Sequence, residues 1–220
     1  SPAAFPIVST PPPRGVHRGS AMGWLNKFRD KSREDLTERL NSLGISAHMA
    51  ERGRPEEKVE SLWIFKKSLG LVDLAKGPIV SINVLKKGGS KDSPPQWWFV
   101  FLVPYDTDAT TDEYRWKLKI KTVRKKSFPL FGKVVDVFWK GNDRGTGLVD
   151  DLSEDQVVDR LVARRGNILI RAHSKHFRWG IQSKRFAMTT EDWNDLEHLA
   201  ERLQHVSSSP VLRTRLSSGR

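Results

Sequence analysis

The sequence predicts an α+β fold: one antiparallel sheet of about five or six strands, helices packed on one face, and basic, disordered tails at both ends. Three observations predict it. Apolar and polar residues alternate with a period of two through the middle of the chain, helical 3–4 spacing occurs near both ends, and the termini combine Pro, Ser and Arg without acids. A chain of 220 residues is long enough for one such domain with its own core.

These patterns divide the chain into three parts. We expect a basic Pro/Ser-rich leader over 1–22, a single α+β domain over 23–205 and a basic tail over 206–220. Within the domain, the predicted order is helical over 23–76, sheet-rich over 78–186 and a C-terminal helix over 189–204.

The first third of the domain shows helix signals. Ser32-Arg33-Glu34-Asp35 resembles a capping box, and Gly44 stands where a helix C-terminus commonly has glycine. We expect a short helix over 46–52 and a longer one beginning at Pro55 and ending at Gly70. The apolar stripe of that longer helix would be Val59, Leu62, Trp63 and Leu69.

Strand signals follow. Val80, Ile82 and Val84 alternate with polar residues, and 96–103 is apolar at nearly every position, as in a central strand covered on both faces. A cationic strand and a strand over 134–140 come next, and their order along the chain predicts an antiparallel meander.

The last third alternates between helix and strand signals. Ser153-Glu154-Asp155-Gln156 predicts a capping box that opens a helix. Strands are expected over 167–171 and around Trp179, and Thr189 is expected to cap the final helix.

The most informative segment is 114–126, which contains no acid. A strand sends successive side chains to opposite faces, so this segment predicts a cationic face and an apolar face. The cationic face would carry Arg115, Lys117, Lys119 and Lys121, and the apolar face Trp116, Leu118, Ile120 and Thr122; Arg124, Lys125 and Lys126 continue the charge. Same-face residues lie roughly 6.5–7 Å apart, close to the phosphate spacing of a single nucleic-acid strand. We therefore predict phosphate binding here, with Lys133 and Lys140 extending the patch across a hairpin. The alternative is a lysine-rich face that only keeps a sheet edge soluble.

A second basic cluster falls in a predicted hairpin turn and adds Arg171, His173, Lys175 and Arg178 to the candidate phosphate- or RNA-binding residues. His173 and His176 could be a metal pair, but their spacing suits a helix and no carboxylate lies nearby in sequence, so we expect no metal site. Trp97, Trp98 and Trp139 lie in or beside apolar runs, which indicates core packing rather than base stacking.

Composition limits the function further. The formal net charge of +12 favours nucleic acid, anionic lipid or an acidic protein surface as partner. The absence of cysteine excludes disulfides, a thiolate nucleophile and Cys-ligated metals. The sequence has no GxSxG, P-loop, GxGxxG or HExxH motif, and we expect no cofactor and no small-molecule substrate.

The acid-free, Pro- and Ser-rich residues 1–29 are typical of a mitochondrial targeting segment or its remnant, or else of a plain leader. We expect a non-catalytic basic accessory subunit, an RNA-contacting component of a mitochondrial ribonucleoprotein such as the ribosome, on the matrix side. Its partners would be RNA or another polyanionic surface and other protein subunits. One alternative is an interaction subunit of an inner-membrane complex that docks on acidic protein or anionic lipid. The other is an enzyme with dispersed acid and base residues.

Overall fold

The computed structural model of the chain describes residues 30–61, 66–104, 118–127, 134–173, 176 and 178–208. Residues 1–30 form one unit and residues 31–220 another. Of the first unit only Asp30 is described, so the predicted leader over 1–22 lies outside the described residues, as does the tail beyond Ser208.

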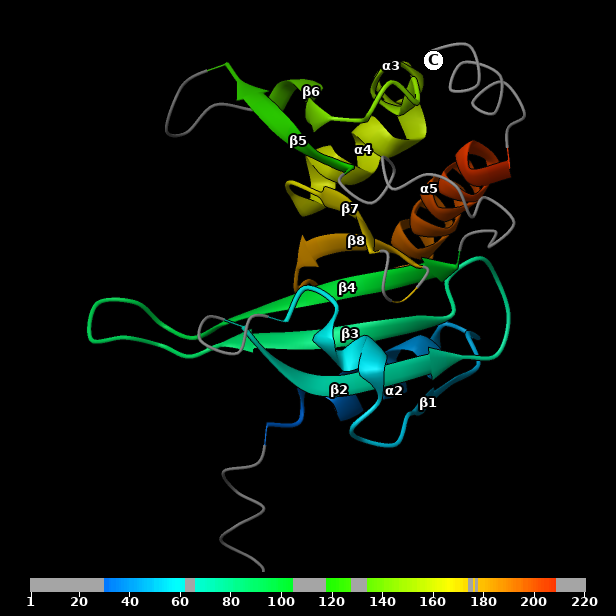
Figure 1. Cartoon of the computed structure of the whole chain (residues 1–220). Helices are drawn as coiled ribbons and strands as arrows, with labels where there is room; N and C mark the ends of the chain where they lie inside the picture. The colour runs from blue at the N-terminus through cyan, green and yellow to red at the C-terminus, as the bar shows by residue number, and fades with distance from the viewer. Residues whose placement is uncertain are drawn as a thin grey trace, which may run out of the picture. The chain divides into compact units, whose positions relative to one another are not determined.

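The second unit is an α+β domain built on one antiparallel sheet (Figure 1). Its elements are α2 (Ser32–Ser42), β1 (Ala47–Met49), the 3-10 helix η1 (Pro55–Lys58), β2 (Lys67–Leu74), β3 (Ser81–Lys87), β4 (Gln96–Pro104), β5 (Lys119–Lys126), β6 (Val134–Asn142), α3 (Leu148–Ser153), α4 (Gln156–Arg165), β7 (Leu169–His173), β8 (Arg178–Lys184) and α5 (Thr190–Ser208). The strand order is β1-β2-β3-β4-β8-β7-β5-β6.

The prediction of an α+β fold with an antiparallel sheet is confirmed, but the sheet has eight strands, not five or six. Two of the strands lie where helices were predicted: β1 within 46–52, and β2 over the end of the predicted helix from Pro55 to Gly70. Among the described residues of that stretch, only Pro55–Lys58 is helical, as a 3-10 turn, while Leu62 and Trp63 of the predicted stripe lie outside the described residues. Gly70 lies at a β-bulge, with φ of +117°, instead of ending a helix. Strand pairing with β3 overrides the weak helical spacing there.

The simple meander is also wrong beyond β4. Strands β1 to β4 pair in sequence order, but the hairpin β7–β8 lies between β4 and the hairpin β5–β6. The long excursion through β5, β6, α3 and α4 therefore returns to the middle of the sheet. Because β8 pairs with β4 over seven residues, this late hairpin joins the two halves of the sheet.

The starts of α2 and α4 differ from the predictions. Lys31 precedes α2 as its N-cap and makes no side-chain cap hydrogen bond, so the capping box predicted at Ser32 is wrong, whereas Gly44 follows the end of α2 as expected. Asp155, not Ser153, caps α4: its side chain accepts hydrogen bonds from the backbone N–H groups of Val157 and Val158. Ser153 is the last residue of α3. Thr189 caps α5 as predicted, because its hydroxyl oxygen accepts from the Asp192 N–H at 3.2 Å.

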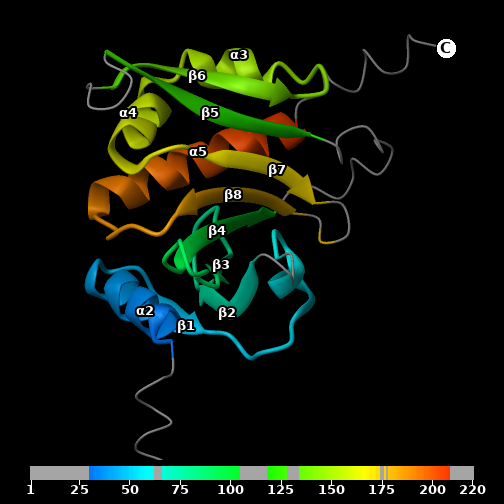
Figure 2. The same cartoon turned by 90° about the vertical axis from the view of Figure 1, so that its left-hand side faces the viewer.

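The two faces of the sheet are covered differently. One, the helix face, packs against α2, α3, α4 and α5, and its largest buried side chains include Phe99 and Phe101. The opposite face is covered over β2, β3 and β4 by the segment 50–61, through a smaller apolar cluster that includes Val59, Leu71 and Leu102. Figure 2 shows α2, α4 and α5 on one side of the strands and the turn of η1 on the other. Over β5 to β8 no described segment makes a comparable apolar cluster on that second face, which we call the open face.

Asn83 on β3 holds the segment 50–61 against the sheet. Its side chain is fully buried, and its amide nitrogen donates to the carbonyl oxygens of Glu57 and Val59, both at 3.0 Å. Its amide oxygen accepts from the Ser68 hydroxyl at 2.6 Å. At about 1 kcal/mol for each buried hydrogen bond, this one side chain holds 50–61 on β2–β4.

Burial along the strands follows this coverage. In β3, the residues Ser81 to Leu85 are all buried, because both faces are covered. In β5 and the residue before it, Leu118, Ile120 and Thr122 are buried while Lys119 and Lys121 are exposed. The predicted alternation of the cationic strand is therefore confirmed over 118–122.

Gly141 sets how closely β6 approaches β5. It lies opposite Ile120 with φ of +138°, and a side chain there would collide with the Lys119 backbone carbonyl. We expect Gly141→Ala to lower the free energy of unfolding by about 1–3 kcal/mol, because the new Cβ meets rigid backbone at an unfavourable φ. Urea unfolding measures this.

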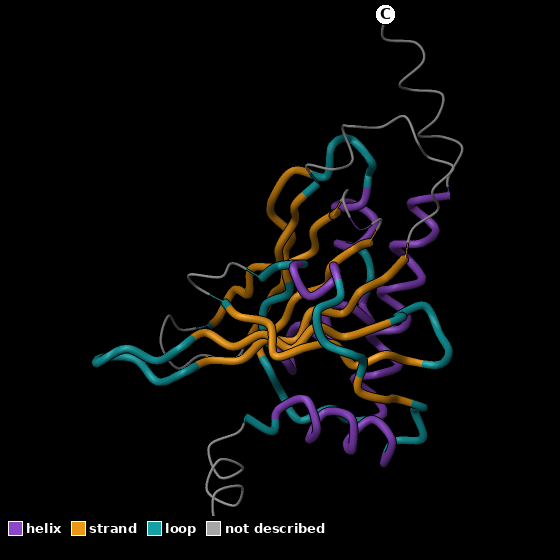
Figure 3. The backbone as a smooth tube through the Cα atoms, turned by 60° about the horizontal axis from the view of Figure 1, so that its bottom comes forward, coloured by secondary structure: helices purple, strands orange, loops and turns teal. Residues whose placement is uncertain are grey.

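Gly88→Ala is the matched control, since a Cβ at Gly88 meets nothing within 4 Å. Gly88 starts the β3–β4 loop, which projects beyond the sheet (Figure 3). Equal stability of the two variants would contradict the close approach of β6 to β5.

Candidate nucleic-acid interface

A groove crosses the open face from β4 to β6, with a volume of about 470 Å³. We call it the lysine groove. It is lined by Trp98, Lys119, Lys121, Thr122, Lys140, Gly141, Asn167, Ile168, Leu169, Gln182, Ser183 and Lys184. Four of these residues are lysines and none is acidic. The residues come from five adjacent strands and the turn before β7, so neighbouring strands, about 4.8 Å apart, bring them together.

The strand register places the groove's side chains in a cross-strand row. Lys140 on β6 lies opposite Lys121 on β5, and Lys121 lies opposite Leu169 on β7. Leu169 in turn lies opposite Gln182 on β8. Paired residues of an antiparallel sheet share a face, so all four side chains project from the open face.

Lys119 begins a second row. It lies opposite Asn142 on β6 and opposite Arg171 on β7. Arg171 lies opposite Gly180, whose missing side chain leaves room for the His173 ring: a Cβ there would come within 3.1 Å of His173 Nε2.

These rows place like charges directly across from one another. Opposed pairs such as Lys121 and Lys140, with Cα atoms about 4.5–5.5 Å apart, destabilise a sheet unless solvent or an anion screens them. Among the described residues, none makes a hydrogen bond or ion pair with the side chains of Lys119, Lys121 or Lys184. Lys140 has no hydrogen bond or ion pair within the same part of the chain, and its Nζ lies 5.1 Å from the centroid of the Phe138 ring. The groove therefore presents four ammonium groups that the described fold leaves without a counter-charge.

Gln182 forms the polar centre of the groove floor. The residue is only 8% exposed, and within the described part of the chain its amide oxygen has no hydrogen-bond donor. Its neighbours in the cross-strand row, Leu169 and Val100, are apolar, so their side chains cannot form a hydrogen bond with it. A buried amide without a partner costs about 1–3 kcal/mol, so this residue opposes folding where it stands.

Trp98 closes the β4 end of the groove. Unlike the buried Trp139, Trp179 and Trp193, it is only partly buried. Lys66 Nζ lies 4.7 Å from the centre of its ring. Burial lowers the pKa of Lys66, an effect that the nearby Glu60 carboxylate opposes.

Glu60 organises a second cluster beside the groove. Its carboxylate is 6% exposed and contacts Arg171 Nη1 at 3.0 Å and His173 Nε2 at 3.2 Å. Burial alone would raise the pKa of Glu60, but His173 and the charges of Arg171 and Lys66 outweigh burial and lower it. Glu60 also has φ of 56°, the left-handed region that non-glycine residues rarely adopt. Arg171 and His173 therefore interact with a buried carboxylate of the fold itself.

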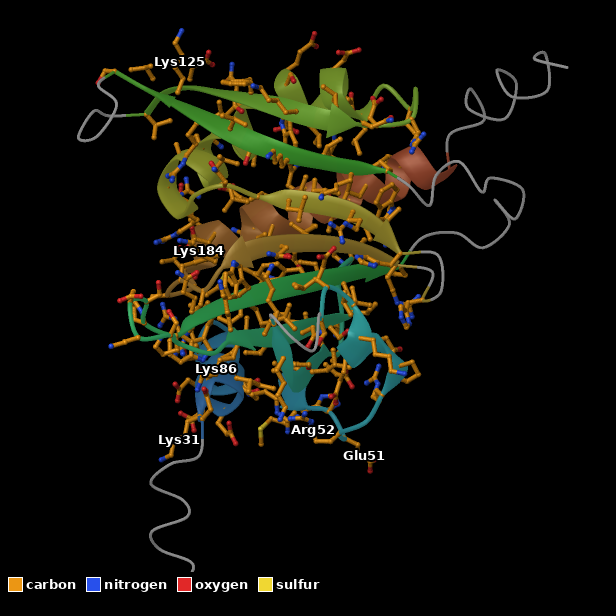
Figure 4. The ribbon with its side chains drawn as sticks, turned by 60° about the vertical axis from the view of Figure 1, so that its left-hand side comes forward. Lys31, Glu51, Arg52, Lys86, Lys125 and Lys184 are labelled. Atoms are coloured by element: carbon orange, nitrogen blue, oxygen red, sulfur yellow. The ribbon has the colours of Figure 1, made fainter. Side chains whose placement is uncertain are left out.

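The predicted phosphate-binding residues therefore do not all lie at one site. Lys119 and Lys121 line the lysine groove, and the predicted extension to Lys140 also lies there. Arg124 lies at its margin, where its Nε donates to the Asn167 side-chain oxygen at 3.2 Å, and Lys125 is exposed near the end of β5 (Figure 4). Arg171 and His173 pair with Glu60, and Arg178 lies opposite His173 on β8. Arg115, Lys117, Lys133 and Lys175 lie outside the described residues, as does the side chain of Lys126.

Sequence reasoning missed Trp98, Gln182 and Lys184 as groove residues. Lys184 is the last residue of β8 (Figure 4). A signal existed, because Arg178, Gly180, Gln182 and Lys184 form the polar parity of a strand whose other parity is Trp179, Ile181 and Ser183. Only the register against β7 and β5 shows that this polar parity continues the lysine row.

Comparison with protein-family models, with curated proteins and with solved structures found no match to this chain. Within the described residues, no cluster of three His, Cys, Asp or Glu side chains is arranged to hold a metal ion. No helix in that part of the chain is long and apolar enough to cross a membrane. The functional argument therefore rests on the geometry of the open face.

The Glu60 cluster gives a pH-dependent stability. Because the folded pKa of Glu60 is lowered, its ionised form stabilises the fold at pH values above its unfolded pKa of about 4.3, and this contribution is lost as pH falls through the folded pKa. We expect Glu60→Gln to lower the free energy of unfolding by about 1–3 kcal/mol at neutral pH. The difference from wild type should shrink as the pH is lowered toward about 3. Thermal unfolding over this pH range measures it.

Glu51→Gln is the control, because Glu51 is exposed and projects from the surface (Figure 4). A difference between Glu60→Gln and wild type that stays constant from neutral to acidic pH would show that Glu60 is not an ionised partner of Arg171 and His173.

Proposed function

We propose that this protein is a non-catalytic, basic accessory subunit of an RNA-containing assembly, and that the lysine groove binds the RNA backbone. The observation that carries the proposal is the convergence of Lys119, Lys121, Lys140 and Lys184 on one groove whose described lining residues include no acid. Each ammonium group can neutralise a phosphate and release a condensed counterion, which is the main source of affinity in binding to nucleic-acid backbones.

The shape of the site supports a linear polyanion. The groove runs across five strands, from β4 to β6, which spans about 19 Å at the usual strand spacing. Its cations are spread along this length: Lys184 lies near the β4 end, and Lys121 and Lys140 lie at the other. A row of phosphates can meet such a series of charges one after another, whereas a small anion would occupy only one end.

The exposed apolar residues do not favour a membrane surface. Peripheral membrane proteins insert apolar side chains beside their basic residues. In the described part of the chain the exposed large apolar residues are Met49 and Val135, and neither lines the lysine groove. We therefore propose RNA, and not anionic lipid, as the partner of this face.

The cellular setting is part of the proposal and rests on the sequence. The acid-free residues 1–29 support a mitochondrial location, on the matrix side, and the net charge of +12 supports residence in an RNA-rich particle such as the mitochondrial ribosome. Other protein subunits of that particle would be its further partners.

The double variant Lys119→Glu, Lys121→Glu tests the proposal. Both side chains are exposed and make no contact that the described fold needs, so the variant should fold. We expect weaker binding to a labelled RNA, because two phosphate contacts are lost. The slope of log affinity against log salt should become shallower by about 1.4–1.8, since each contact contributes roughly 0.7–0.9. Fluorescence anisotropy at several salt concentrations measures both.

The control is Lys31→Glu, Lys76→Glu, which changes the net charge equally. Lys31 lies at the far end of the domain from β5 (Figure 4), and Lys76 lies in the β2–β3 turn, four strands from β5. An equal loss of RNA affinity in the two double variants would show that binding depends only on overall charge, and would contradict the lysine groove as the binding site. Tight binding to phosphatidylglycerol vesicles without binding to RNA would favour the membrane alternative.

A further inference from the structure

Resting on the proposed RNA-binding function, we infer that the lysine groove takes single-stranded RNA and holds an unpaired base against Gln182. The inference comes from the polar centre of the groove, which phosphate contacts leave unexplained. Four lysines can neutralise the charge of a backbone, yet the groove also holds Gln182, a residue only 8% exposed whose amide oxygen has no hydrogen-bond donor among the described residues.

The chemistry of that amide selects the ligand. At neutral pH a phosphate diester offers only acceptors, and it can satisfy lysine but not the Gln182 amide oxygen. A carboxamide carries an acceptor and a donor side by side, and its natural complement is a group with a donor and an acceptor at the same spacing. Nucleobase edges have this pattern, and Gln forms such paired hydrogen bonds with adenine.

The surroundings of Gln182 fit a base. Leu169, opposite it on β7, gives an apolar floor, and Trp98 gives a partly exposed aromatic wall on the β4 side. A planar base can rest on such surfaces while its edge reaches the amide. A groove of about 470 Å³ lies within the size range of ligand pockets, which is roughly 300–1,000 Å³.

A duplex does not fit this site. Its bases are stacked and paired, so their hydrogen-bonding edges are not free to reach a buried amide at the bottom of a groove. Single-stranded RNA presents unstacked bases together with a flexible row of phosphates. The lysines would position the backbone, and Gln182 would supply the contact that distinguishes an unpaired base from a paired one.

The test compares three probes of about 12 nucleotides, within the usual site sizes for single-strand binders: a single-stranded RNA, an RNA duplex and an abasic ribose-phosphate strand. We expect Gln182→Leu to weaken binding of the single strand by roughly tenfold, without changing the salt slope. Binding of the duplex and of the abasic strand should stay the same. Leucine should be tolerated beside Leu169 and Val100, and melting should occur at an equal or higher temperature because a buried unpaired amide is removed.

Gln96→Leu is the matched control, since Gln96 is exposed on β4 and does not line the lysine groove. Gln182→Met replaces the leucine variant if that one fails to fold. Equal affinity of wild type and Gln182→Leu for the single strand would overturn the inference, as would equal wild-type affinity for RNA with and without bases. Salt-dependent binding would then remain, and the proposed function would stand. If none of the three probes binds in a salt-dependent way, the proposed function itself fails.

Discussion

The docking of the segment 50–61 through Asn83 determines which strands are covered on the face that carries the lysine groove. One buried amide donates to two backbone carbonyls of that segment and accepts from Ser68, so the segment is held over β2, β3 and β4. Helices already cover the opposite face along its length. No segment of the described ranges covers the open face of β8, β7, β5 and β6 in this way, and the lysine groove lies there.

Two buried carboxamides on the same face of the sheet differ in their hydrogen bonding. Asn83 is fully satisfied by protein groups and acts as a structural fastener. Gln182, one strand beyond Val100 in the same cross-strand row, is nearly as buried and has no partner among the described residues. This contrast supports the inference that Gln182 contacts a ligand, because residues at binding sites are often unfavourable for stability.

The cations of the open face also differ in whether the fold supplies them with a partner. Glu60 neutralises Arg171 and contacts His173 at the border of the covered half, so these cations belong to the fold. Within the part of the chain that the structure describes, the lysines on β5, β6 and the end of β8 have no such acid. The cost of opposed lysines in adjacent strands is reduced when an anion lies between them, which couples the stability of the β5–β6 hairpin to the bound state.

The sequence predicted local features well and long-range features poorly. The alternation through Leu118 to Thr122 depends only on the period of a strand, and it correctly separated Lys119 and Lys121 from the core. The helix predicted after Pro55 failed because pairing of β2 with β3 decides that segment. Gln182 and Lys184 could not be assigned, since their place beside Leu169 and Lys121 follows from the insertion of β7–β8 between β4 and β5. Trp98 was predicted to pack in the core, and it does pack against the smaller apolar cluster, but only the structure shows that it also lines the groove.

Lysine footprinting tests the central claim most directly. The protein would be acetylated briefly with and without bound single-stranded RNA, and the modification of each lysine compared by mass spectrometry. The account predicts protection of Lys119, Lys121, Lys140 and Lys184, with Lys31, Lys58 and Lys76 modified equally in both states. Protection of those distant lysines, with the four groove lysines unchanged, would contradict it.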